Sequence, residues 1–232
     1  MTRLGIIGAM DEEIEILKNH MDIEETIDIA SMSFFKGKIE DKEVILVRCG
    51  IGKVNAAVCT QILASNFNVT HIINTGVAGA VHEDLNVGDI VISSDVLQHD
   101  FDATGFGYKL GEIPRMDTYI FKADQRLVDI VYDASKDENI KHKTMIGRIL
   151  SGDVFVACPD KKNHLWENFE GFCTEMEGAS IGHTSYLNNI PFVIIRAVSD
   201  KADGTAHDNF NEFVIEAARN SSNIVMNVIK HI

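Results

Sequence analysis

The chain of 232 residues carries 35 acidic residues against 21 lysines and arginines, a formal net charge of −14. Such acidity argues against a nucleic-acid partner and against an anionic membrane surface. The length suits a single domain, residues 1–232, although two small domains would also fit it. The four cysteines form no C-x-x-C pair, which argues against a disulfide framework or a metal site. Because an acid appears as early as Asp11 and no apolar run is long enough to span a bilayer, we expect a cytoplasmic protein.

Segments typical of strands and helices alternate along the chain. The expected strands are runs of apolar and β-branched residues: 4–8, 34–39, 44–48, 71–75, 87–93, 147–150 and 191–200. One expected helix begins at Asp11. The other expected helices cover residues 54–64, 161–169, 177–187 and 211–229. The strands 34–39 and 44–48 are expected to form a hairpin. This alternation predicts an α/β protein, a three-layer α/β/α sandwich around a mixed, mostly parallel twisted sheet.

The ends of the expected strands are the best candidates for a binding site. Asp200 closes the apolar run 191–200, and ligands of α/β sheets bind beyond the carboxyl ends of the strands. Three other strands run into glycine-containing segments, 50–52, 76–79 and 151–152, which we expect to be loops. One such loop alone is most often an ordinary turn, but several at one sheet edge favour a small-molecule site.

Two groups of acids stand at expected helix starts. Asp11, Glu12 and Glu13 follow the first strand, where they would repel a phosphate that a bare helix N-terminus attracts. Glu175 and Glu177 are two residues apart and cannot share one helix face, so at most one should point into a site. Neither a dinucleotide-binding fingerprint nor a P-loop is present, so no nucleotide cofactor is expected.

Taken together, these motifs resemble the bacterial 5′-methylthioadenosine/S-adenosylhomocysteine nucleosidases of the purine nucleoside phosphorylase-like superfamily. The matching segments follow the order of the family and cover nearly the whole chain: 5–13, 50–57, 74–79, 88–91, 99–100, 106–108, 151–155, 175–179 and 196–202. The resemblance implies a nucleoside phosphorylase-like fold. It also implies hydrolysis of an N-glycosidic bond, which releases adenine from a 5′-thio-substituted ribose without a cofactor.

The resemblance implies a role for each of three acids. Glu13 matches the acid that activates the attacking water, Asp200 the acid that protonates adenine N7, and Glu177 the acid that holds the ribose hydroxyls. Such chemistry needs a general acid at the leaving purine and a carboxylate on the opposite side, where anions also favour the developing oxocarbenium charge. Burial at a strand end would raise the pKa of Asp200 so that it keeps its proton near neutral pH.

The resemblance also implies the residues that contact the substrate. The main chain of Val156 would read the adenine edge, Phe155 would stack on adenine, and Met176 would lie under the ribose. Met10 and Ile51 would line the pocket for the 5′ substituent. The other implied contact residues are Val77, Ala78, Gly79, Glu175, Ser199 and Phe210.

The family usually completes the 5′ end of its site with the partner subunit of a homodimer. Phe106 and Pro114 match the segment that the partner supplies. A homodimer is therefore implied by the resemblance, although no separate sequence pattern indicates it. Without the resemblance, these apolar residues would be interpreted as core packing.

One residue departs from the family pattern. Many relatives have a serine at the position of Val77, and that hydroxyl is thought to bond the catalytic aspartate. Valine has no hydroxyl, so Asp200 must find another partner, for which Ser199 or a main-chain N–H is the candidate.

Two alternatives to a hydrolase stay open. A phosphorylase of the same superfamily would use phosphate as nucleophile and would need cations, for which Arg48, Lys53 and Arg196 are candidates. A non-catalytic purine-binding protein on the same fold is the other, because fold does not dictate function. The acidic first loop argues against the phosphorylase, and the three acids together argue against a mere binding protein. The sequence does not rank methylthioadenosine, S-adenosylhomocysteine, 5′-deoxyadenosine and 6-amino-6-deoxyfutalosine as substrates.

Overall fold

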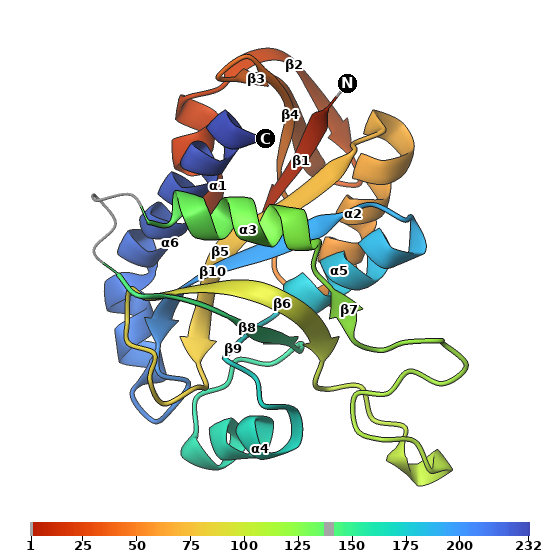
Figure 1. Cartoon of the computed structure of the whole chain (residues 1–232), viewed down its shortest axis with the longest axis vertical. Helices are drawn as coiled ribbons and strands as arrows, with labels where there is room; N and C mark the ends of the chain where they lie inside the picture. Colours follow the sequence, from red (N-terminus) through yellow and green to blue (C-terminus); the bar gives the residue numbers. More distant parts are fainter. Residues whose placement is uncertain (1, 137–141) are drawn as a thin grey trace.

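A computed structural model describes residues 2–136 and 142–232, and a mixed sheet runs through its centre (Figure 1). The strands are β1 (Arg3–Gly8), β2 (Asp22–Ile29), β3 (Met32–Ile39), β4 (Lys42–Arg48), β5 (His71–Ala80), β6 (Ile90–Gln98), β7 (Phe121–Lys122), β8 (Thr144–Ser151), β9 (Cys173–Glu175) and β10 (Phe192–Asp200). The helices are α1 (Asp11–Asn19), α2 (Lys53–Phe67), the 3₁₀ turn η1 (Thr104–Phe106), α3 (Gln125–Ala134), α4 (Pro159–Phe169), α5 (Gly178–Leu187) and α6 (Ala206–His231).

Helices cover both faces of the sheet, as the alternation along the chain predicts. In β10, Val193 and Ile195 pack with α1, α3 and α6, whereas Phe192 and Ile194 pack on the other side with α2 and α5. Successive side chains of a strand point to opposite faces, so a run that is apolar throughout requires a helix layer on each side. The predicted three-layer α/β arrangement is therefore confirmed.

Parallel pairs join β4 to β1, β1 to β5, β5 to β10, β6 to β8 and β8 to β9, and antiparallel pairs make up the rest of the sheet. The predicted hairpin is confirmed as β3 and β4. Because β5 pairs with both β10 and β9, the strands β5, β10, β6, β8 and β9 close a ring. The sequence patterns do not predict this closure, which depends on the three-residue strand β9.

One expectation about the strand ends is wrong. Residues 76–79 were expected to form a loop after the strand 71–75, but β5 continues through them to Ala80. The backbone stays extended because β10 pairs with it throughout, with Gly76 opposite Arg196 and Gly79 opposite Asp200. The other two glycine segments do follow strands: Gly152 comes after β8, and the turn 50–52 links β4 to α2 with positive φ angles at both glycines.

Within the described residues, no helix is both long enough and apolar enough to cross a membrane.

Candidate active site

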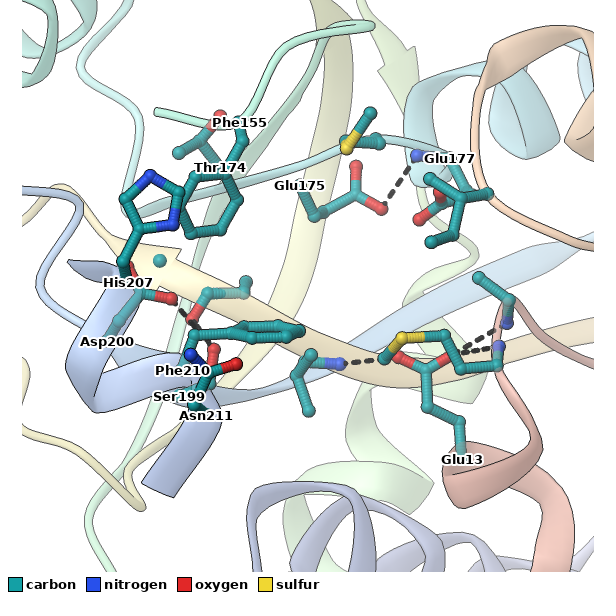
Figure 2. Close-up of a pocket in the computed structure, with 17 residues that line it drawn as sticks. Glu13, Phe155, Thr174, Glu175, Glu177, Ser199, Asp200, His207, Phe210 and Asn211 are labelled. Atoms are coloured by element: carbon teal, nitrogen blue, oxygen red, sulfur yellow. Dashed lines mark hydrogen bonds between the residues drawn. The ribbon is translucent and has the colours of Figure 1, made fainter. Parts of the chain in front are cut away.

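A cavity of about 370 Å³ opens at the carboxyl ends of β1, β5 and β10, where ligands bind in α/β sheets. Figure 2 shows the side chains around it. The cavity is lined by thirteen of the predicted site residues: Met10, Glu13, Ile51, Val77, Ala78, Gly79, Phe155, Glu175, Met176, Glu177, Ser199, Asp200 and Phe210. Segments that are far apart in the sequence therefore meet at one site.

Three predicted site residues lie outside this lining. Val156 lines a smaller adjoining cavity of about 30 Å³, together with Gly79 and Asp200. Phe106 and Pro114 line neither cavity, and Phe106 is 87% exposed. Both belong to the segment that was expected to serve a partner subunit, so their place in a dimer stays a prediction.

Four further residues line the cavity, and none of them is a predicted site residue: Ala9, Thr174, His207 and Asn211. The ring of His207 lies 4.8 Å from that of Phe155, and Phe210 contacts the same ring edge-on at 5.8 Å. His207, Phe210 and Asn211 are spaced three and four residues apart at the start of α6, so they share one helix face. The three-residue spacing before Phe210 is the signal that could have identified His207.

Glu13 is buried at one end of the cavity, and its carboxylate is held by backbone N–H groups. Its Oε2 accepts hydrogen bonds from the N–H groups of Ala9 (2.6 Å) and Met10 (3.1 Å), and its Oε1 accepts one from Val77 (3.0 Å). The carboxylate thus joins the first turn of α1 to β5. Burial raises the pKa of Glu13, while the charge of Arg196 and the three N–H donors oppose that rise.

Arg196 lies in the middle of β10 and is almost wholly buried. Its Nη2 donates to Asn74 Oδ1 (2.6 Å) and to the carboxylate of Glu175, with which it forms a buried ion pair. Glu175 also accepts hydrogen bonds from the Ser151 hydroxyl and from the N–H of Gly178 at the start of α5.

Glu175 and Glu177 both line the cavity, so the expectation that at most one of them faces the site is wrong. That expectation assumed one helix, whereas Glu175 ends β9 and only Glu177 stands at the start of α5. The oxygens of Glu175 are nevertheless engaged by the protein.

Glu177 sits at the start of α5, on the same side of the cavity as Glu13. Its Oε1 accepts a hydrogen bond from the N–H of Gly52 (2.8 Å), and its Oε2 lies 4.0 Å from Arg196 Nη2. Burial and the negative charge of Glu175 raise the pKa of Glu177 to about 8. The Gly52 turn, which follows β4, is thereby tied to the start of α5.

Asp200 ends β10 at the opposite end of the cavity from Glu13 and Glu177 (Figure 2). Its Oδ2 accepts a hydrogen bond from the Ser199 hydroxyl (2.9 Å), and its Oδ1 accepts one from the N–H of Ala202 (2.8 Å). The prediction that Ser199 or a main-chain N–H replaces the hydroxyl missing at Val77 is confirmed, since both donors are present. Burial raises the pKa of Asp200, and these two donors oppose the rise.

Two glycines of β5 make room for the acids. A Cβ at Gly76 would lie 2.5 Å from Glu13 Oε1 and 3.2 Å from Arg196 Nη1, and a Cβ at Gly79 would lie 2.8 Å from Asp200 Oδ1. Both distances to carboxylate oxygens are shorter than side chains tolerate. The strand can therefore pass beside both ends of the cavity only because these positions have no side chain.

The arrangement supplies acid and base groups at opposite ends of one apolar cavity. Asp200 can donate a proton at one end, whereas Glu13 and Glu177 can accept protons or hydrogen bonds at the other (Figure 2). In residues 2–136 and 142–232, no group of three or more His, Cys, Asp or Glu side chains is placed to hold a metal ion.

Comparisons with known proteins agree with this geometry. The family model described as "Phosphorylase superfamily" matches residues 3–230. A 5′-methylthioadenosine/S-adenosylhomocysteine nucleosidase of Staphylococcus haemolyticus is 47% identical over 228 residues, which cover 98% of this chain and 99% of that protein. One from Oceanobacillus iheyensis is 45% identical over 230 residues, covering 99% of each chain.

Solved structures extend the comparison to three dimensions. The Neisseria meningitidis 5′-methylthioadenosine/S-adenosylhomocysteine nucleosidase, in complex with methylthio-immucillin-A, aligns with a TM-score of 0.96 at 37% identity and covers all of both chains. A futalosine hydrolase of Helicobacter pylori aligns with a TM-score of 0.93 at 30% identity, covering 100% of this chain and 98% of that one. The chain therefore belongs to the phosphorylase superfamily and, within it, to the 5′-methylthioadenosine/S-adenosylhomocysteine nucleosidases.

Proposed function

We propose that the protein hydrolyses the N-glycosidic bond of 5′-methylthioadenosine and S-adenosylhomocysteine, and also that of 5′-deoxyadenosine. The products are adenine and the 5-substituted ribose, so the enzyme would serve methionine salvage and removal of a methyl-transfer by-product in the cytoplasm. The observation that carries the proposal is the cavity with buried Asp200 at one end and buried Glu13 and Glu177 at the other. The relatives of known name support the same activity.

Asp200 acts as the general acid in this proposal. It donates its proton to adenine N7 as the bond between C1′ and N9 breaks, and the bonding electron pair leaves with the purine. The acid must be protonated before this step, and burial raises its pKa in the required direction. Ser199 and Ala202 hold the carboxyl group in place through their hydrogen bonds.

Glu13 acts as the general base on the other side of the sugar. It takes a proton from a water molecule whose oxygen bonds to C1′ as the positive charge of the oxocarbenium ion is quenched. The three backbone N–H groups fix the direction of its carboxylate. Arg196 favours the ionised form that a base requires.

Glu177 binds the ribose hydroxyls, and the neighbouring side chains complete the substrate contacts. A pKa near 8 lets Glu177 donate as well as accept a hydrogen bond at neutral pH. Phe155 stacks on adenine, while Met176 lies under the ribose and the 5′ substituent extends toward Met10 and Ile51. Their positions in the cavity lining support these roles. Val156, in the adjoining small cavity beside Asp200, reads the adenine edge through its main chain.

The candidate cations support hydrolysis over phosphorolysis. Arg196 is buried and paired with Glu175, Lys53 is paired with Asp100 (2.6 Å), and Arg48 lies outside the cavity lining. A phosphate at the start of α1 would also lie beside the buried carboxylate of Glu13. A site built this way favours water as the nucleophile.

The active form is a homodimer in this proposal. Apolar side chains on α2 and α5 are exposed, among them Val54 (74% exposed), Val58 and Leu187, and Ile51 beside the cavity is also exposed. Apolar patches of this kind mark protein interfaces. Phe106, on the segment that resembles the family's partner-supplied loop, is exposed as well.

The first prediction concerns the nucleophile. The wild-type protein should release adenine from 5′-methylthioadenosine in phosphate-free buffer, and added phosphate should not increase the rate. Product analysis should find the free 5-methylthioribose. Phosphate-dependent turnover that yields a sugar 1-phosphate would show the protein to be a phosphorylase.

In the same assay, Asp200→Asn should lower kcat by about a hundredfold or more, because the amide cannot supply the proton. Asp208→Asn, an exposed acid on α6 outside the cavity lining, is the matched control and should leave kcat within about threefold. A circular dichroism spectrum and a melting curve identify any variant that has lost its fold. Near-normal turnover by folded Asp200→Asn would refute the assignment of the proton donor.

The second prediction is a shift of the pH profile. The Ser199 hydroxyl stabilises the ionised form of Asp200 and so opposes the rise of its pKa. Ser199→Ala should raise that pKa further, so the alkaline fall of kcat/KM should move up by about half a pH unit or more. The double variant Ser199→Ala/Val77→Ser places a hydroxyl where many relatives have one. In this variant the alkaline fall of kcat/KM should return toward its wild-type pH. An alkaline limb that stays in place in Ser199→Ala would contradict the proposed hydrogen-bond control.

The third prediction concerns assembly. Sedimentation equilibrium at micromolar concentration should give twice the mass of one chain for the wild-type protein. Val54→Glu, which puts a charge into the exposed apolar face of α2, should give the mass of one chain because an unpaired charge disfavours an interface core. A monomeric wild-type protein would overturn the dimer.

A further inference from the structure

An exposed ion pair lies beside the cavity and has no part in the proposed chemistry. Arg48 Nε is 3.1 Å from Asp11 Oδ1, and the side chains are 50% and 80% exposed. Arg48 is the last residue of β4, and Asp11 is the first residue of α1. Met10 precedes Asp11 and Ile51 follows Arg48 by three residues, and both of these line the cavity.

The backbone keeps the two charges at the same edge of the sheet. β1 and β4 are parallel neighbours with Gly8 opposite Arg48, and the N–H of Cys49 donates to the carbonyl of Gly8 (2.9 Å). The chain then turns from β1 into α1 and from β4 toward α2. The ion pair thus bridges the two turns that supply Met10 and Ile51 to the cavity wall.

An ion pair this exposed adds little to the stability of a fold, because water solvates both charges. For the same reason, either charge can exchange its partner for a ligand group at small cost. Lys53, the next basic residue along the chain, is instead held by Asp100 (2.6 Å) and Gln98 (3.3 Å). Arg196 is buried inside the sheet. Arg48 therefore offers a guanidinium to solvent beside the Met10 and Ile51 wall.

We propose that Arg48 and Asp11 form a subsite for the zwitterionic amino-acid tail of S-adenosylhomocysteine. The carboxylate of the tail pairs with the guanidinium of Arg48, and the ammonium group of the tail pairs with the carboxylate of Asp11. Each charge of the tail therefore meets a side chain of opposite charge. The methyl group of 5′-methylthioadenosine ends before this point and gains nothing from the pair. The subsite rests on the proposed function, since it extends the cavity at its 5′ end, and it makes the two residues determinants of specificity rather than catalytic groups.

The test compares kcat/KM for S-adenosylhomocysteine with kcat/KM for 5′-methylthioadenosine in each protein preparation. Arg48→Met should lower this ratio about three- to tenfold, the effect of losing one partly exposed charged contact. Arg48→Lys should retain most of the ratio because the charge remains. Lys36→Met removes a surface ion pair on the β2–β3 hairpin, with Glu25, and should leave the ratio as in the wild type.

Two analogues of S-adenosylhomocysteine assign the charges separately. Arg48→Met should lower kcat/KM for the analogue that lacks only the amino group, because this analogue still carries the carboxylate that pairs with Arg48. It should leave kcat/KM for the analogue that lacks only the carboxylate as in the wild type. Asp11→Asn should show the reverse pattern. A ratio within twofold of wild type in both Arg48→Met and Asp11→Asn would overturn the subsite. Failure of the proposed function is distinct, because the wild-type protein would then release no adenine from 5′-methylthioadenosine.

Discussion

The buried ion pair between Arg196 and Glu175 is the interaction on which the rest of the site depends. The guanidinium of β10 reaches Asn74 in β5 and Glu175 in β9, so a single side chain connects three strands of the closed ring. Glu175 in turn accepts from the first N–H groups of α5, which fixes Glu177 beside the cavity. A buried charge of this kind is tolerated only when it is paired and hydrogen-bonded.

The positive charge of Arg196 also lowers the pKa values of the surrounding acids against the larger effect of burial. Arg196 opposes the rise in pKa that burial imposes on Glu13 and Glu177, although burial still raises the pKa of both acids. Asp200 lies at the other end, where Ser199 and Ala202 are its hydrogen-bond donors and burial raises its pKa. Burial thus raises the pKa of the acids at both ends of the cavity, while the charge of Arg196 opposes the rise at Glu13 and Glu177, and hydrogen bonds from Ser199 and Ala202 oppose it at Asp200.

Sequence patterns predict the acids at the two ends of the cavity better than the strands and contacts that lie between them. Asp200 and Glu13 were identifiable because Asp200 closes an apolar strand and Glu13 stands shortly after another. Family motifs also surround both residues. Residues 76–79 were misjudged because glycine and alanine weaken a strand pattern, whereas pairing with β10 overrides that local preference. α3 was not predicted from the sequence, although it has the signals of a helix: Asp124 caps it at the N–H of Leu127, and its buried residues have helical spacing. Ring closure through β9 and the contact of His207 with Phe155 arise from tertiary packing, which spacing along the chain does not encode.

A double-mutant cycle on the buried ion pair measures whether Arg196 and Glu175 stabilise the protein as one unit. The free energy of unfolding would be measured by urea denaturation for wild type, Arg196→Met, Glu175→Gln and the double variant. Each single variant leaves one group unpaired and should lose about 3–5 kcal/mol. The double variant should lose clearly less than the sum, with a coupling energy of at least about 1 kcal/mol. Losses that add within about 0.5 kcal/mol would show that the two side chains act independently and would contradict the central role of the pair.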